Sequence, residues 1–369
     1  MPIISFAQDT AIANQQGYFK GRVERIIGTK SESFPNSETQ VVVQDILVRI
    51  VSGDHKGDLV EVTNDFNPME IGDTFWGQWV TTSTGITVFA VSDFERTGSL
   101  VFLIVLFAIA VVILGKVQGL RSLGSLILSI LAIVYILIPL LLKGVPPIPV
   151  TIFVGALVLF FAIFITHGFN RISAIAFGGT IIAVAVTSMF ASFVTKLTHM
   201  TGFATHEAIY LNFNTGGTLD FVGIFLASII IGMLGVLDDI SVTQVAVVRE
   251  LYAVGGNISK KDLFTRALRV GKEHVSALVN TLVLAYVGVA LPTILFFATA
   301  TSPVGQIINS EAFAAEIVRT VLGSLGLIMT VPLTTWLAVV FLHKTKGQPL
   351  SEQEKNHAHA HGHGHDHHH

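Results

Sequence analysis

Two adjacent carboxylates, Asp238 and Asp239, lie inside a long apolar run of the sequence. The run begins at Phe221 and continues to Val248 apart from this polar patch. A charged Asp near the centre of a bilayer costs at least ~2.5–3.5 kcal/mol, so it rarely occurs there without a partner or a task. Further side chains with oxygen ligands follow directly after the pair: Ser241, Thr243 and Gln244. We expect this segment to bind Na⁺, Mg²⁺, Ca²⁺ or Mn²⁺, or to relay protons.

Neighbouring residues on a helix point about 100° apart, so Asp238 and Asp239 face one ligand only where the helix unwinds. Gly232 and Gly235 would permit such a break or the close approach of another helix. Broken helices with carboxylates and free carbonyl groups hold the coupling ions of secondary transporters. Alternatively, the membrane span stops at Leu237, and Asp238 caps a following helix beside a cluster of Lys and Arg.

A second polar group lies in the connection between residues 196 and 220. Its candidate site residues are His199, His206, Glu207 and Asp220. Imidazole and carboxylate groups together ligate metals or relay protons. The spacing matches no established metal motif, and an ordinary solvated loop is the alternative. Ala204–Phe213 is apolar enough for a re-entrant segment over a cavity.

Two further features complete the candidates. Asn280 lies in an apolar run, so we expect its amide to face other helices and to assist the ion site. The C-terminal tail alternates His with Ala and Gly, at His357, His359, His361, His363, His365 and His367. Flexible imidazoles bind divalent metals such as Zn²⁺ or Ni²⁺, which favours a metal buffer or sensor. An affinity tag or a neutral low-complexity tail is the alternative, and no other cofactor is expected.

The composition requires that these residues be positioned by membrane helices. The 369 residues are 51% hydrophobic and 13% charged, about half the charge of a soluble domain, and the mean hydropathy is +0.68. Apolar runs of this length cross a bilayer and predict an α-helical polytopic membrane protein. We expect about seven spans, near Ser99–Gly115, Ser122–Leu142, Ile148–Thr166, Ile172–Thr195, Phe221–Ser241, Ser276–Ala298 and Val318–Leu342.

Residues 17–96 have a different pattern. Five short β-like segments predict a small all-β domain of the OB or SH3-like kind: Gly17–Gly28, Gln40–Ser52, Leu59–Thr63, Thr74–Val80 and Thr87–Val91. OB barrels that bind nucleic acid need exposed aromatic side chains and a basic groove. We expect neither here, and therefore predict a structural or partner-binding role and no nucleic acid.

The ends of the chain are expected to lie on opposite sides of a cell membrane. The connection Arg249–Lys272 is rich in Lys and Arg, which places it in the cytoplasm, together with the tail, residues 346–369. The β-domain then lies outside, before a transmembrane domain of residues 97–345. Residues 1–16 resemble the remnant of a signal or anchor segment, with an unstructured N-terminus as the alternative.

The basic connection also has helical character. Ser259 is a suitable N-cap, and the following residues have one apolar face. They predict either a helix on the inner membrane surface or a cytoplasmic extension of the next span.

Several function classes are excluded or disfavoured. The sequence has no cysteine, which excludes disulfides and thiol chemistry. It has no Walker motif, nucleophile elbow or HExxH motif, so we do not expect an enzyme. An intramembrane hydrolase usually places its two carboxylates on facing helices, whereas Asp238 and Asp239 are adjacent on one.

Two long motifs resemble the YibE/F-like family of membrane proteins. They run from Gly235 to Glu250 and from Phe264 to Tyr286. The resemblance extends to two turns of the β-domain, residues 52–57 and 64–72, and covers about residues 17–345. It implies the membrane architecture but no particular activity. Family members usually have a hydrophobic segment before the barrel, and its absence here favours a truncated start.

The sequence therefore supports two hypotheses about function. The leading one is a secondary transporter or channel-like carrier of a small ion or solute, with Asp238 and Asp239 as the coupling carboxylates. The other is a non-transporting scaffold or sensor that links the outer β-domain to cytoplasmic partners. The lipid bilayer is a partner in both, and the oligomeric state stays open, a homo-oligomer included.

Overall fold

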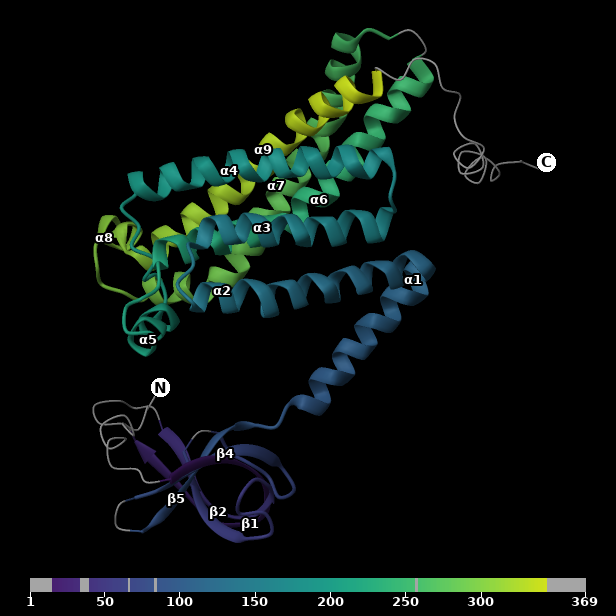
Figure 1. Cartoon of the computed structure of the whole chain (residues 1–369). Coiled ribbons are helices and arrows are strands. Elements are labelled where there is room, and N and C mark those ends of the chain that lie inside the picture. Colours follow the sequence, from purple (N-terminus) through teal and green to yellow (C-terminus); the bar gives the residue numbers. More distant parts are fainter. Residues whose placement is uncertain (1–14, 34–39, 66, 83–84, 256–257, 344–369) are drawn as a thin grey trace, which may run out of the picture. The chain divides into compact units, whose positions relative to one another are not determined.

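The computed structural model describes residues 15–33, 40–65, 67–82, 85–255 and 258–343 (Figure 1). The chain divides into two compact units, Met1–Ala110 and Val111–His369. The first unit holds a five-stranded antiparallel sheet and the start of the first long helix, and the second holds the other helices. This confirms a small all-β domain followed by a bundle of membrane helices.

The sheet closes on itself. Its strands are β1 (Gln15–Ser33), β2 (Gln40–Ser52), β3 (Leu59–Asn64), β4 (Thr74–Thr81) and β5 (Thr87–Phe94). They pair antiparallel in the order β3-β2-β1-β4-β5, and the two edge strands, β3 and β5, contact each other. Read around the barrel, the order β1-β2-β3-β5-β4 is that of an OB barrel, one of the two kinds expected.

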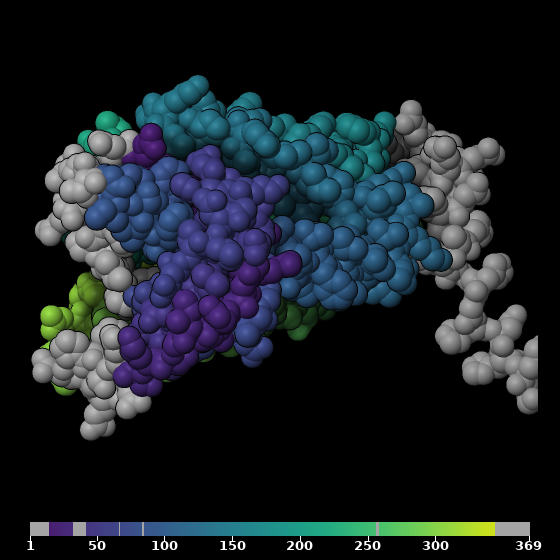
Figure 2. Space-filling view, turned by 90° about the horizontal axis from the view of Figure 1, so that it is seen from below, coloured from purple at the N-terminus to yellow at the C-terminus, as the bar shows by residue number. Residues whose placement is uncertain are grey.

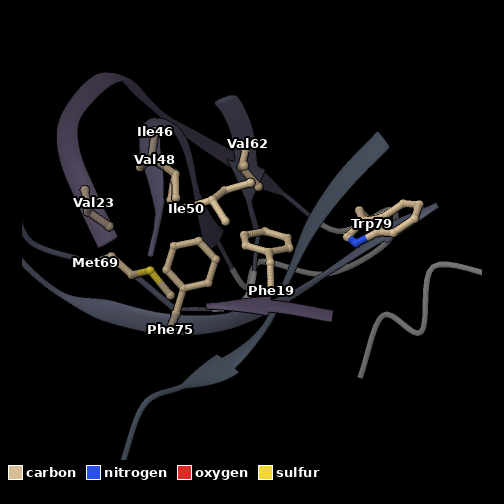
Figure 3. Packing of buried hydrophobic residues seen from close by; sticks show 9 residues of the cluster. All are labelled: Phe19, Val23, Ile46, Val48, Ile50, Val62, Met69, Phe75 and Trp79. Carbon is tan, nitrogen blue, oxygen red and sulfur yellow. The ribbon is translucent and has the colours of Figure 1, made fainter. Parts of the chain in front are cut away.

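Aromatic rings fill the barrel. Phe19 and Phe75 are fully buried and meet edge to face, with ring centroids 5.9 Å apart (Figure 3). Each such side chain contributes about 1.5–3 kcal/mol through burial. Gly21 and Gly77 leave room for these rings, because a Cβ at either position would come within 3.0 Å of one of them. The alternation of buried and exposed residues in β1 and β4 thus builds the core.

One expectation about the barrel surface is wrong. Tyr18 and Trp76 lie on the outer face with 68% and 43% of their surfaces exposed, so exposed aromatic side chains are present. They alternate with the buried Phe19 and Phe75, as strand geometry requires. Figure 2 shows one face of the barrel, coloured purple to indigo.

The first membrane helix is bent. Helix α1 (Thr97–Ala132) continues through a π-helical turn, η1 (Ile133–Leu137), into α2 (Ile138–Leu142), a total of 46 residues. At 1.5 Å per residue this is about 69 Å, roughly twice the thickness of a bilayer core. Lys116 has a positive φ of 48°, a conformation that favours glycine, and the helix is kinked there. The kink divides the helix into two arms of span length, and the hairpin that the sequence predicts there stays a prediction.

Five further helices are long and apolar enough to cross a membrane, which makes six candidate spans among the described residues. The helices after α2 are α3 (Pro147–Phe160) with a π-helical turn η2 (Phe161–Ile165), α4 (Arg171–Leu197), α5 (His206–Asn214), α6 (Phe221–Gly255), α7 (Lys260–Ala298), α8 (Val304–Asn309) and α9 (Glu311–His343). The bend in α1 reconciles six helices with about seven predicted spans.

Helix α7 decides between the two expectations for the basic connection. It runs unbroken from Lys260 to Ala298, so the basic segment is an extension of the next span rather than a separate surface helix. Ser259 is the N-cap, as expected, and its hydroxyl accepts a hydrogen bond of 3.1 Å from the backbone N–H of Asp262.

Small residues bring the central helices together. Gly179 of α4 lies against Thr334 of α9, where an added Cβ would come within 2.9 Å of the hydroxyl. Gly155 of α3 similarly faces Leu234 of α6. Membrane helices pack through such small-residue contacts because lipid provides no hydrophobic drive for their association. Helices α4, α6 and α9 thereby form the buried centre of this unit.

Candidate functional site

Asp238 and Asp239 line one cavity of the helical unit. Helix α6 is continuous at this point, so the expected break does not exist. Asp238 is half-buried, Asp239 is exposed, and the backbone N–H of Asp239 donates a hydrogen bond of 2.9 Å to the Asp238 carboxylate. Both carboxylates nevertheless border the same cavity of about 340 Å³. A cavity of this width accommodates two side chains that leave the helix in different directions.

A row of hydroxyl groups forms another wall of the cavity. Ser122, Ser125 and Ser129 come from the second arm of α1, at positions i, i+3 and i+7. This spacing places them on one face of a helix. Ser125 and Ser129 are buried, so the arm turns its polar stripe toward α3 and α6 rather than outward.

Thr166 and His167 also line the cavity and directly follow the span formed by α3 and η2. They follow the π-helical turn η2, whose wider winding shifts the direction of the residues after it. The side-chain amide of Asn170 donates a hydrogen bond of 2.9 Å to the backbone carbonyl of His167. The Asn170 side-chain oxygen in turn accepts one of 2.9 Å from the Ser173 N–H and caps α4. The backbone that carries His167 is therefore held by the cap of the next helix.

Burial and the charge of Asp239 act on the pKa of His167. Although its ring is exposed at the rim of the cavity, the surrounding protein removes water and lowers the pKa of His167 below its usual value. The negative charge of Asp239 acts in the opposite direction. His167 is thus mainly neutral at pH 7, with one ring nitrogen able to accept a proton or to bind a cation.

The remaining walls of the cavity are apolar. They are formed by Leu126, Val158, Leu159, Ala162 and Leu234. Gly235 also borders the cavity, and a Cβ added there would meet no atom within 4 Å. Gly235 therefore leaves open space one turn before the carboxylates, and a larger side chain there would enter the cavity.

Ser241 and Gln244 lie away from the cavity. Both are buried, and both contact α9: Ser241 pairs with Thr334 at 3.4 Å, and the Gln244 amide donates to Thr335 at 2.7 Å. Thr243 is exposed. Ser241 and Gln244 thus face α9, and none of the three residues lines the cavity. The structure does not bring them together with Asp238 and Asp239.

Asn280 is not part of the cavity either. It is exposed on α7, where we expected its amide to face other helices of the chain. Nearby, a smaller cavity of about 210 Å³ lies between α7 and α9 and has nearly apolar walls. Its one carboxylate, Glu316, accepts a hydrogen bond of 2.6 Å from Arg319, so this cavity carries no net charge.

The connection between residues 196 and 220 contains a short helix. Thr205 caps α5, which starts at His206 and Glu207. A hydrogen bond from the backbone of Glu207 itself, and another from the Thr205 side chain, lower the pKa of Glu207. Asp220 caps α6 by accepting a hydrogen bond of 2.8 Å from the Gly223 N–H. His199 lies in a turn with a φ of 51°.

Across the described residues, no three His, Cys, Asp or Glu side chains gather closely enough to hold a metal ion. In the connection between residues 196 and 220, the structure shows helix caps at Thr205 and Asp220. The histidines of the tail, residues 357–367, lie outside the described residues.

Sequence reasoning found the two carboxylates and missed most of their neighbours. The serines at i, i+3 and i+7 in the second predicted span were the available signal for a polar helix face. Thr166 and His167 could not be found in this way, because their direction depends on the π-helical turn before them.

The site as a whole is an open, negatively charged cavity between membrane helices. Its two carboxylates, one imidazole and four hydroxyl groups offer mostly hard oxygen ligands. Such a set can bind a small cation or pass protons among its members.

Comparison with known proteins gives one match. Residues 103–344, about two-thirds of the chain, match the family model for YibE/F-like protein. No match was found among curated proteins or among solved structures. The matched segment includes all lining residues of the carboxylate cavity but not the β-barrel. The resemblance of the barrel to the family therefore stays a prediction. The match over the membrane helices shows that the chain belongs to the YibE/F-like family.

Proposed function

We propose that this chain is a secondary transporter or channel-like carrier of a small ion or solute. Asp238 and Asp239 hold the ion during transfer. One observation carries the proposal: the two carboxylates share a cavity with His167 and the α1 serines, inside a unit made of membrane helices. Carboxylates in such a unit are costly unless they take part in function.

The chemistry of the walls supports a cation or a proton as the transferred species. The carboxylates supply charge, and the hydroxyl groups of Ser122, Ser125 and Ser129 can replace part of a hydration shell. His167, neutral at pH 7, adds a site that can accept a proton near Asp239.

The basic residues support a cavity that opens on the cytoplasmic side. Helices α3 and α6 start beside each other, where Gly223 approaches Pro147, and so run in the same direction. His167 at the end of α3 then lies toward the same membrane face as the basic residues after α6. By the positive-inside rule, the basic residues favour a cytoplasmic position for that face and a position outside for the β-barrel.

The experiment is a flux screen in proteoliposomes. Purified protein is reconstituted, and protons, Na⁺ and a panel of divalent cations are tested against protein-free vesicles. We expect flux for at least one ion, and its loss in the double variant Asp238→Asn/Asp239→Asn while the protein stays folded. If the wild type transports nothing, the carrier proposal fails, and the scaffold hypothesis then predicts partners that co-purify.

A further inference from the structure

Glu95, in the connection between the barrel and the first membrane helix, makes hydrogen bonds to both and an ion pair to the barrel. Its backbone N–H donates a hydrogen bond of 2.9 Å to the carbonyl of Thr74 at the start of β4. Its carboxylate accepts one of 3.1 Å from the N–H of Thr97, the first residue of α1, and pairs with Lys20 of β1 at 3.3 Å. The Glu95 side chain is only 9% exposed. Glu95 thus connects two strands to the start of α1: its carboxylate contacts Lys20 of β1 and Thr97, and its backbone N–H contacts Thr74 of β4.

A second set of contacts stiffens the same connection. Arg96 donates a hydrogen bond of 2.6 Å to Asp93, and its guanidinium lies 5.8 Å from the centre of the Phe94 ring. Only residues 95 and 96 separate β5 from α1. The side chain of Arg96 contacts Asp93 and Phe94, and the backbone of Glu95 contacts Thr74. The barrel surface beside Glu95 therefore keeps a fixed distance from the first turn of the helix.

Helix α1 becomes apolar almost at once. Leu100, Val101 and Phe102 are more than half exposed. Exposed apolar side chains of a membrane helix are available to contact lipid tails. Leu100 lies three residues after Thr97, about 5 Å along the helix axis. The barrel side chains that contact Glu95 therefore adjoin the start of this apolar segment.

The barrel face next to Glu95 has the composition of a membrane interface. It consists of outward side chains of β1 and β4, which we call the junction face: Tyr18, Lys20, Arg22 and Trp76. Lys20 and Trp76 are direct cross-strand partners, and the Lys20 ammonium lies 6.0 Å from the Trp76 ring centre. Trp and Tyr are enriched where lipid tails meet headgroups, and Lys and Arg attract lipid phosphates. Within the described residues, Arg22 is exposed and has no ion-pair partner.

We propose that the junction face rests on the phospholipid headgroups where the first span enters the bilayer. Tyr18 and Trp76 insert their rings at the boundary of headgroups and tails, while Lys20 and Arg22 contact phosphate groups. The partner is the lipid surface itself. This proposal is independent of any transport activity and of the carboxylate cavity.

The test uses the full chain, which has no cysteine that would compete for a label. Gln78 is exposed on β4 and pairs with Tyr18, so Gln78→Cys leaves all four residues of the junction face intact. Glu61→Cys on β3 is the matched control, because Glu61 is exposed on a strand that does not adjoin β1 or β4. Each variant carries a bimane fluorophore in vesicles of phosphatidylcholine and phosphatidylglycerol.

We expect lipids with brominated tails to quench the label at position 78 at least about twofold more than the label at 61. Aqueous iodide should show the reverse order. Arg22→Glu should weaken the quenching at 78 in vesicles that contain phosphatidylglycerol, since it repels anionic headgroups. Equal quenching at both positions overturns the proposal. Protection from iodide at 78 without quenching by brominated lipid also overturns it, because protein rather than lipid then covers the face.

Discussion

The side-chain amide of Gln244 in α6 donates a hydrogen bond of 2.7 Å to the hydroxyl of Thr335 in α9. The same amide group donates another of 3.0 Å to the carbonyl of Ala267 in α7. Gln244 therefore joins three membrane helices at a buried point. Gly271 of α7 allows this contact, since a Cβ there would come within 2.7 Å of the Gln244 side-chain oxygen. Gln244 has a structural role, separate from the carboxylate cavity.

Replacement of Gln244 should reduce stability and leave transport intact. Gln244→Leu removes both hydrogen bonds, and we expect it to lower the free energy of unfolding by about 1–3 kcal/mol. Thermal unfolding in detergent measures the change, with Thr243→Val as an exposed neighbour that should have little effect. If the folded Gln244→Leu protein lost its flux while Thr243→Val kept it, Gln244 would belong to the ion path and the structural role would be wrong.

A larger side chain at Gly235 should obstruct the cavity without disturbing the fold. Gly235→Leu places its branched end in open space beside the carboxylates, because no atom lies within 4 Å of a Cβ there. We expect flux to fall at least about tenfold, since access to Asp238 and Asp239 is closed.

Gly288→Leu is the matched control for Gly235→Leu. Gly288 of α7 also has no atom within 4 Å of an added Cβ, but it does not line the cavity. Its flux should equal that of the wild type. Equal flux in both variants would show that ions do not pass through this cavity.

His167 should make stability dependent on pH. Because burial lowers the pKa of His167, the unfolded chain binds a proton at this residue more readily than the folded protein does. Stability should therefore decline as the pH falls below about 6.5, the usual value for His, and level off below the folded pKa. Thermal unfolding between pH 7.5 and pH 5 measures this slope, with changes on the order of a few degrees.

The variant His167→Gln should flatten part of that slope. His206→Gln is the control, because His206 is exposed at the start of α5 and should leave the slope unchanged. A slope that is the same in the wild type and in His167→Gln would mean that the environment of His167 does not disfavour its charged form.

Glu311 should control the order of the connection between residues 196 and 220. Its carboxylate at the start of α9 accepts hydrogen bonds from the N–H groups of Thr201 and Gly202, at 2.8 and 2.7 Å. Glu311→Ala removes both acceptors, and we expect about tenfold faster hydrogen exchange at these amides, or ~1.4 kcal/mol of opening free energy. Glu207→Ala, on the neighbouring helix α5, should not change their exchange. Unaltered exchange in Glu311→Ala would show that other contacts hold this segment.

The architecture could be predicted because apolar runs and strand alternation are strong local signals. Asp238 and Asp239 were identifiable because carboxylates rarely occur in apolar runs. The five strands were also found, although the sequence did not reveal that Tyr18 and Trp76 stay exposed. Their exposure depends on which face of β1 and β4 the barrel encloses, and packing rather than propensity decides this.

The composition of the site depended on features beyond the local sequence. We expected Ser241 and Gln244 to join the carboxylates through a broken helix, but α6 stays helical and turns them toward α9. The actual neighbours, Ser125 and His167, come from helices far away in the chain. Only the arrangement of α1, α3 and α6 around one cavity brings them there, and a single sequence holds no direct signal of that arrangement.

The most direct test of the carboxylate cavity compares two variants of the same helix. Asp238→Asn/Asp239→Asn removes both charges from the cavity, whereas Glu250→Gln removes an exposed charge from the far end of α6, where Glu250 pairs with Arg249. Initial flux of the transported ion is measured in vesicles with equal amounts of folded protein. We predict less than about a tenth of wild-type flux for the double Asp variant and near wild-type flux for Glu250→Gln. Wild-type flux in the double Asp variant would contradict the assignment of the ion site to Asp238 and Asp239.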